Sequence, residues 1–176
     1  FYGSPGTAEH AVRMANELLA VMKLKGGVPV YQGASRTLAD TRTPTDNEAV
    51  RFIIREAMRE DVKTPLYLVC GAGLTDAASA WLTMPEIAGK LRLIWIGGAE
   101  YPGTPPPPGA ARVEYNLSID IKAAQVIFNQ SDLTLWQVPR STYRQSLVSD
   151  AELEHRMRPD QHKLPRYLMD RLEDLM

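Results

Sequence analysis

The sequence has almost no cysteine and almost no net charge. Cys70 is the single cysteine, which excludes an internal disulfide and leads us to expect a reducing, cytoplasmic environment. Lysine and arginine together number 20 against 21 aspartates and glutamates, for a net charge of −1. This balance supplies no field that would gather nucleic acid or hold a protein on an anionic membrane. We therefore expect no nucleic-acid partner and no membrane partner.

Long apolar runs and nucleotide-binding glycine motifs are also missing. No stretch approaches the roughly 18 apolar residues of a membrane span, and no signal peptide is visible. The glycine-rich residues 71–76 match neither GxGxxG nor GxxxxGK[ST], which disfavours a dinucleotide-binding or P-loop enzyme. With 44% hydrophobic and 23% charged residues, a chain of 176 residues is expected to fold as one domain around a sizeable core.

Short apolar runs recur along the chain and have the composition of buried strands. They are rich in β-branched and aromatic residues and are too short for helices. The runs span residues 66–70, 91–96 and 133–138, with a shorter one at residues 28–31. Val69 and Cys70 are both expected to be buried in the first run, so that a charge at Val69 would prevent folding.

Segments with helical periodicity alternate with these runs. They follow Gly3 and then span residues 49–58, 77–82, 120–128 and 164–176. Capping-box spacings are present in two pairs, Thr45 with Glu48 and Ser149 with Glu152. The alternation predicts an α/β fold with a mostly parallel, open, Rossmann-like sheet and helices on both faces. We expect residues 1–176 to form a single domain that is incomplete at both ends.

Residues 91–128 have the order of a ligand site in such a sheet. A strand ends in two glycines, a loop with four prolines at residues 105–108 follows, and Glu114, Asn116 and Asp120 precede a helix. Open α/β sheets bind ligands at the carboxyl ends of their strands. The proline run is expected to be a stiff surface loop beside the site. Asp120 is interpreted as the N-cap of the helix that follows it.

Two short motifs carry the candidate chemistry. Glu114 and Asn116 are two residues apart, so in an extended chain their side chains point the same way. A carboxylate beside a carboxamide can clamp a diol, although an exposed polar strand edge explains the pair equally well. Thr75 and Asp76 follow the first strand and read as an N-cap pair. The alternative is that a backbone carbonyl freed at this turn binds a hard cation.

In their order, these segments resemble the inosine–uridine preferring nucleoside hydrolase family. The matching pieces are Asn16, residues 29–34, Gly73-Leu74-Thr75, Ile96-Gly97-Gly98-Ala99, Glu114-Tyr115-Asn116, Asp120 with Ala123-Ala124, and residues 133–139. The resemblance implies a calcium-dependent enzyme that hydrolyses the N-glycosidic bond of ribonucleosides to free base and ribose. It implies that the Thr75 carbonyl binds Ca²⁺ and that Glu114 and Asn116 bind ribose hydroxyls. It also implies association into homo-oligomers.

The sequence departs from the family pattern at important positions. The aspartate cluster DxDxxxDD expected upstream and the histidine–aspartate pair expected downstream do not occur, so no catalytic residue is assigned. Asp76 stands where the family usually has asparagine. Two other functions stay open. One is a non-catalytic member or fragment that binds a nucleoside, a sugar or a partner subunit, and the other is an unrelated nucleotide-dependent α/β transferase.

Overall fold

The structure is a computed structural model that describes residues 6–159 and 162–174. These residues group into two compact units, and the single domain expected from the sequence stays a prediction. The described part of the first unit comprises residues 6–9 and 31–145, and that of the second comprises residues 10–30, 146–159 and 162–174. Within the described ranges, no helix is long and apolar enough to cross a membrane.

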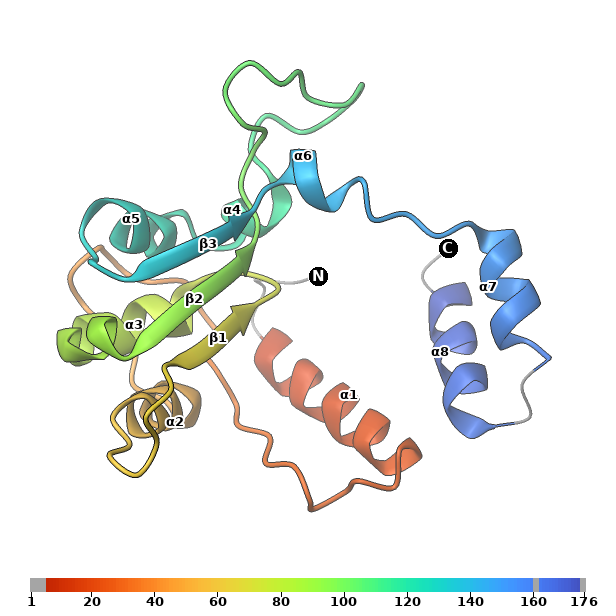
Figure 1. Ribbon diagram of the computed structural model, residues 1–176, viewed down its shortest axis with the longest axis horizontal. Coiled ribbons are helices and arrows are strands. Elements are labelled where there is room, and N and C mark those ends of the chain that lie inside the picture. The colour runs from red at the N-terminus through yellow and green to blue at the C-terminus, as the bar shows by residue number, and fades with distance from the viewer. Residues whose placement is uncertain (1–5, 160–161, 175–176) are drawn as a thin grey trace. The chain divides into compact units, whose positions relative to one another are not determined.

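A parallel sheet forms the frame of the first unit (Figure 1). Its strands are β1 (Leu66–Cys70), β2 (Leu91–Ile96) and β3 (Thr134–Val138), and β2 lies between the other two. The register pairs Cys70 with Trp95 and Ile96 with Val138, so all three carboxyl ends lie at the same edge of the sheet. This arrangement confirms the predicted α/β fold class and three of the predicted strands.

Helices cover one face of the sheet. The face is packed by α2 (Glu48–Ala57), α3 (Thr75–Thr83), the 3₁₀ helix η1 (Pro85–Gly89) and α5 (Ile121–Asn129) (Figure 1). Leu91, Leu93 and Trp95 alternate along β2 and are no more than 1% exposed in the core beneath these helices. Burying such side chains is the main favourable contribution to the fold. In the described part of this unit, helices therefore cover this face of the sheet, as the sequence predicts.

The opposite face of the sheet is apolar but open. Tyr67, Val69 and Trp136 are 52%, 62% and 52% exposed. The prediction that Val69 is buried is therefore wrong. An apolar run is typical of a strand covered on both faces, whereas β1 is covered on one and alternates with period two. Cys70 is half-buried on the covered face, and burial raises the pKa of its thiol to about 12, as befits a neutral strand residue.

Several local predictions need correction. Residues 28–31 form no strand. The N-cap of α2 is Asn47 rather than Thr45, because the Asn47 side chain accepts the Val50 N–H. Thr45 instead bonds Ser79 on α3 through its own hydroxyl and N–H.

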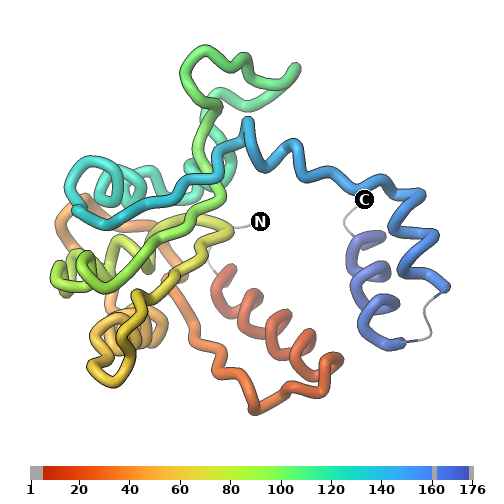
Figure 2. Tube along the Cα trace, in the orientation of Figure 1, coloured from red at the N-terminus to blue at the C-terminus, as the bar shows by residue number. Residues whose placement is uncertain are grey.

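The chain leaves the carboxyl end of β2 in a long surface loop, residues 97–113. Figure 2 shows its path in green, before the trace reaches α4 (Tyr115–Ile119). Three of the four prolines at residues 105–108 are exposed, as predicted for a surface loop. After β3 comes the one-turn helix α6 (Arg140–Tyr143), which ends close to the boundary of this unit.

The second unit is helical. It contains α1 (Thr7–Val21) from His10 onward, α7 (Asp150–Met157) and α8 (Lys163–Glu173). Ser149 is the N-cap of α7, as its spacing from Glu152 predicts. Arg158 pairs with Glu154 and with Glu173 of α8, while Arg171 of α8 pairs with Glu17 of α1. Exposed ion pairs of this kind contribute little stability each.

Substitutions on the two faces of the sheet should differ sharply in cost. Leu93→Ala removes a fully buried side chain and should lower the free energy of unfolding by about 3 kcal/mol, because it leaves a cavity. Val69→Thr keeps the β-branched shape on the open face and should change it by less than about 0.5 kcal/mol. Urea unfolding followed by circular dichroism measures both. Equal losses would mean that Val69 is covered.

Candidate functional site

Glu114 lies at the carboxyl edge of the sheet as a buried carboxylate. It is 1% exposed and is the N-cap of α4. Its Oε2 accepts the N–H of Gly98 at 2.8 Å and that of Leu117 at 3.0 Å. Its Oε1 accepts the hydroxyl of Tyr143 at 2.9 Å. These donors come from the end of β2, from α4 and from α6, and together they fix the carboxylate in one orientation.

Asn116 lies two residues further on and is tied to the same strand end. Its Nδ2 donates to the carbonyl of Ile96, the last residue of β2, at 2.7 Å. The prediction of an extended Glu114–Asn116 pair is wrong, because α4 begins at Tyr115. Helical geometry separates the directions of the two side chains. The structure nevertheless brings both to the carboxyl end of β2, through Gly98 and Ile96.

Tyr143 is a site residue that the sequence pattern does not reveal. Burial and its hydrogen bond to Glu114 raise the pKa of the phenol to about 12. The phenol is therefore protonated at neutral pH and is able to donate to the carboxylate. Tyr143 is 29 residues from Glu114 in the sequence, and only the return of the chain through β3 places them together.

Thr75 and Asp76 open α3 instead of capping it, so the N-cap prediction is wrong. Leu74 is the N-cap residue and makes no side-chain cap bond. The hydroxyl of Thr75 donates to Asp120 at 2.7 Å. Asp76 accepts the N–H of Ala34 at 3.0 Å and the Nδ2 of Asn47 at 2.8 Å. These side chains join α3 to neighbouring segments.

Asp120 caps α5, as predicted. Its Oδ1 accepts the Ala123 N–H at 2.9 Å, which is the N-cap bond. Its Oδ2 accepts the Leu38 N–H at 2.9 Å in addition to the Thr75 hydroxyl. Asp120 is 3% exposed, so it is a second buried carboxylate whose oxygens are both bonded.

The described residues do not assemble a calcium centre by themselves. They contain no group of three or more histidines, cysteines, aspartates or glutamates placed to hold a metal. Both oxygens of Asp120 accept hydrogen bonds, and both oxygens of Asp76 bond the Ala34 N–H. The Thr75 carbonyl keeps a second lone pair in the first turn of α3, but calcium takes six to eight oxygen ligands. No chemical step is therefore assigned to the ion.

An ion pair connects the loop after β2 to the helix after β3. The Nε and Nη2 atoms of Arg140 donate to the two carboxylate oxygens of Glu100 at 2.5 and 2.8 Å. Its Nη1 donates to the carbonyl of Ala111 at 3.1 Å. The side chains of Arg140 and Glu100 are largely buried. The sequence pattern does not predict this pair, and its one available signal is that Arg140 directly follows the β3 run and Pro139.

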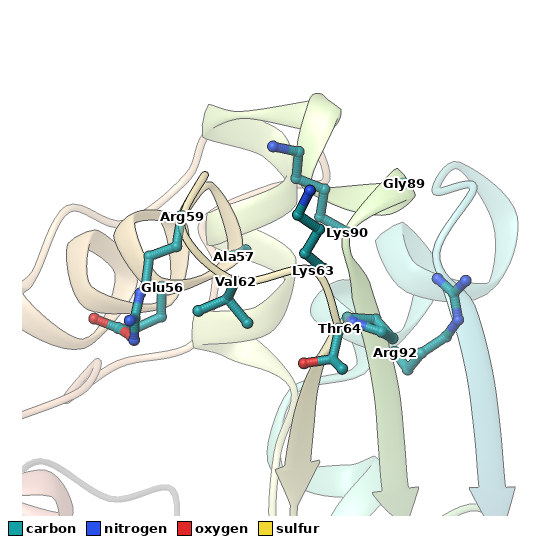
Figure 3. A pocket seen from close by; sticks show the side chains of 10 residues that line it. Glu56, Ala57, Arg59, Val62, Lys63, Thr64, Gly89, Lys90 and Arg92 are labelled. Carbon is teal, nitrogen blue, oxygen red and sulfur yellow. The ribbon is translucent and has the colours of Figure 1, made fainter.

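Two hollows lie at opposite ends of the sheet. One, of about 280 Å³, is mainly apolar and is lined by Trp95, Gly98, Ala99, Leu117, Ile121, Ala124, Gln125, Phe128, Asn129 and Gln137. It adjoins the carboxyl ends of β2 and β3. The other, of about 220 Å³, lies at the amino ends of β1 and β2, where Lys63, Lys90 and Arg92 are among its lining residues (Figure 3). Its position excludes it from the candidate site.

Comparison with known proteins decides the family. The sequence profile described as inosine-uridine preferring nucleoside hydrolase matches residues 3–175. The chain belongs to this family. It is 33% identical over 113 residues to the inosine-uridine preferring nucleoside hydrolase of Crithidia fasciculata, an alignment that covers 64% of this chain and 31% of that protein.

A solved structure of a nucleoside hydrolase shares the fold. The inosine-uridine preferring nucleoside hydrolase from Bacillus anthracis superposes with a TM-score of 0.52 at 18% identity, covering 65% of this chain and 38% of that one. The chain thus spans about a third of the length of the relatives it matches. Family membership decides against an unrelated nucleotide-dependent transferase.

The Glu100–Arg140 pair should be visible in a pH titration. The hydrogen bonds that Glu100 accepts from Arg140 lower the pKa of Glu100 from 4.5 to about 2. A carboxyl whose pKa is lowered on folding stabilises the fold above pH 4.5 and loses that contribution as the pH falls toward 2. In Arg140→Gln, the pKa of Glu100 should return toward 4.5, measured by NMR of the side-chain carboxyl.

Arg144→Gln provides the control for that titration. Arg144 acts on Glu100 only by a weaker Coulomb attraction, so this change should move the Glu100 pKa much less. An equal shift in the two variants would mean that general charge, and not the bidentate contact, sets the pKa.

Proposed function

We propose that the protein hydrolyses the N-glycosidic bond of ribonucleosides, releasing the base and ribose. The observation that carries the proposal is a buried, oriented carboxylate, Glu114, held at the carboxyl edge of a parallel sheet beside Asn116. That edge is where open α/β sheets bind ligands. Membership of the nucleoside hydrolase family supplies the reaction class, and the names of the relatives supply the substrate class.

In this proposal, Glu114 and Asn116 bind ribose hydroxyls. The Oε1 atom of Glu114 accepts one hydrogen bond from Tyr143, and a carboxylate oxygen has room for another donor. Asn116 uses Nδ2 on Ile96, which leaves its Oδ1 as an acceptor. A sugar hydroxyl donates to either oxygen. Several such contacts orient the sugar for attack at its anomeric carbon, where the transition state is oxocarbenium-like.

No described residue is assigned as the general base. A base must have an oxygen or nitrogen free to take the proton of the attacking water. Asp120 accepts three hydrogen bonds, Glu114 accepts three, and Asp76 is bonded to Ala34 and Asn47. Asp120 and Asp76 hold segments of the chain together, and the remaining acceptor capacity of Glu114 is assigned to the sugar.

A second candidate function follows because no described residue is assigned as the general base. The same sugar clamp without a base would bind a nucleoside or a sugar and leave its bond intact. Release of free ribose from a nucleoside by the full-length protein separates the two functions, because a binding protein saturates with ligand and releases none.

Calcium, self-association and a cytoplasmic location belong to the proposal as family expectations. Thr75 would contribute one carbonyl ligand to the ion in the full-length protein. The open apolar face at Tyr67, Val69 and Trp136 supports association, since large exposed apolar patches mark interfaces. The single cysteine supports a reducing compartment. Sedimentation equilibrium checks self-association, and cell fractionation checks the cytoplasmic location.

Loss of the Glu114 charge should weaken catalysis without unfolding the protein. Glu114→Gln keeps the side-chain size but replaces charge-assisted bonds with weaker neutral ones, so kcat/KM should fall about 10- to 100-fold. The measurement is ribose release from a nucleoside by the full-length protein. Gln130→Ala, an exposed change at the end of α5, is the control and should have no effect. Unchanged kinetics in Glu114→Gln would remove this residue from the site.

Removal of calcium should abolish turnover and be reversible. After chelation, turnover of the full-length protein should fall by more than about tenfold and return with Ca²⁺ but not with Mg²⁺, which prefers a smaller octahedral shell. A calorimetric titration of the chelated protein with Ca²⁺ should give a saturable isotherm. Full activity in chelator together with a flat isotherm would reject calcium as the cofactor.

A further inference from the structure

We propose that Tyr143 is a positioning residue that orients the carboxylate of Glu114 toward a ribose hydroxyl. The inference rests on the proposed sugar-binding role of Glu114 and adds a specificity-determining residue to it. It stands on the contacts that surround this carboxylate.

The two oxygens of Glu114 are held in different ways. Oε2 is fixed by two backbone N–H groups, those of Gly98 and Leu117, which belong to the turn after β2 and to α4. Oε1 receives one donor among the described residues, the Tyr143 hydroxyl. Oε1 is therefore the atom with capacity left for a sugar hydroxyl. The phenol sets the rotation of the carboxylate and hence the direction in which that capacity points.

Tyr143 is itself held by the network at the carboxyl edge. Its N–H donates to the carbonyl of Pro139 at 3.0 Å. The N–H of Arg140 donates to the carbonyl of Gly98 at 3.0 Å, and the Arg140 side chain clamps Glu100. Gly98 thus bonds α6 through its carbonyl and Glu114 through its N–H. The same residue, Gly98, thus fixes both the carboxylate of Glu114 and the helix that carries the phenol, so their geometry is preorganised.

A positioning role and a merely structural role predict different substrate dependence. If Tyr143 only stabilises the fold, its loss weakens turnover of every nucleoside alike. If it orients Glu114 on one ribose hydroxyl, its loss matters only for substrates that carry this hydroxyl. A nucleoside series lacking the 2′-, 3′- or 5′-hydroxyl in turn distinguishes the two roles.

The test uses Tyr143→Phe and Glu114→Gln in the full-length protein, assayed on a ribonucleoside and on its three deoxy analogues. Tyr143→Phe should lower kcat/KM about tenfold on the ribonucleoside, the value of one hydrogen bond to a charged group. This loss should vanish on one deoxy analogue, the same one on which the Glu114→Gln loss vanishes. Tyr101→Phe, which removes a hydroxyl from an exposed side chain in the loop after β2, is the matched control and should leave all four values unchanged.

Three outcomes overturn the inference. An equal loss on all substrates would assign Tyr143 a structural role. No loss in Tyr143→Phe, with a clear loss in Glu114→Gln, would leave the sugar clamp intact and remove Tyr143 from it. No loss in either variant would reject the Glu114 clamp of the proposed function itself.

A second variant covers the case in which Tyr143→Phe does not fold. Replacing Tyr143 with tetrafluorotyrosine closely keeps its shape and lowers the pKa of the phenol from about 12 into the pH range of the assay, so that the donor is lost at mildly alkaline pH. The alkaline limb of the kcat/KM profile should then move to far lower pH than in the unmodified protein. An unmoved limb would overturn the inference.

Discussion

The burial of the Glu114 carboxylate is the constraint on which the carboxyl edge of the sheet depends. A buried charge without partners costs several kcal/mol or more, so the fold must deliver donors to both oxygens. It does so from three separate segments, through Gly98, Leu117 and Tyr143. The turn after β2, the start of α4 and the end of α6 are therefore fixed relative to one another by a single side chain.

The turn after β2 meets this demand only because of its glycines. Gly98 has φ +89°, a conformation that L side chains rarely adopt, and a Cβ there would lie 2.2 Å from Nε2 of Gln137. Gln137 approaches so closely because Nε2 donates to the carbonyl of Gly97 at 2.9 Å. A side chain at residue 98 would displace the peptide whose N–H binds Glu114. The sequence predicts only that this glycine pair ends a strand, and the structural role of Gly98 is more specific.

The parts of the fold that local pattern governs are predictable from this sequence. The three longer strand runs, the helix periodicity and the caps at Asp120 and Ser149 each depend on neighbours within a few residues, and the structure confirms them, whereas the short run at residues 28–31 forms no strand. The open face at Val69 was missed, because a run of apolar residues does not say which faces are covered. The Glu114–Tyr143 and Glu100–Arg140 contacts were missed for a related reason. They join segments 29 and 40 residues apart, and no local pattern encodes such pairs.

The hydrogen bonds that each carboxylate accepts distinguish two tasks within the proposed enzyme, which are holding the sugar and activating water. A carboxylate that holds a sugar benefits from being buried and fixed, because its orientation then costs no entropy when the ligand binds. A carboxylate that takes a proton from water needs an accessible, unbonded oxygen. Glu114 has the first character, and so does Asp120, whose three donors leave it a structural cap. In the proposed enzyme, Glu114 is therefore suited to hold the sugar, and the activation of water is a separate task for which both carboxylates are poorly placed.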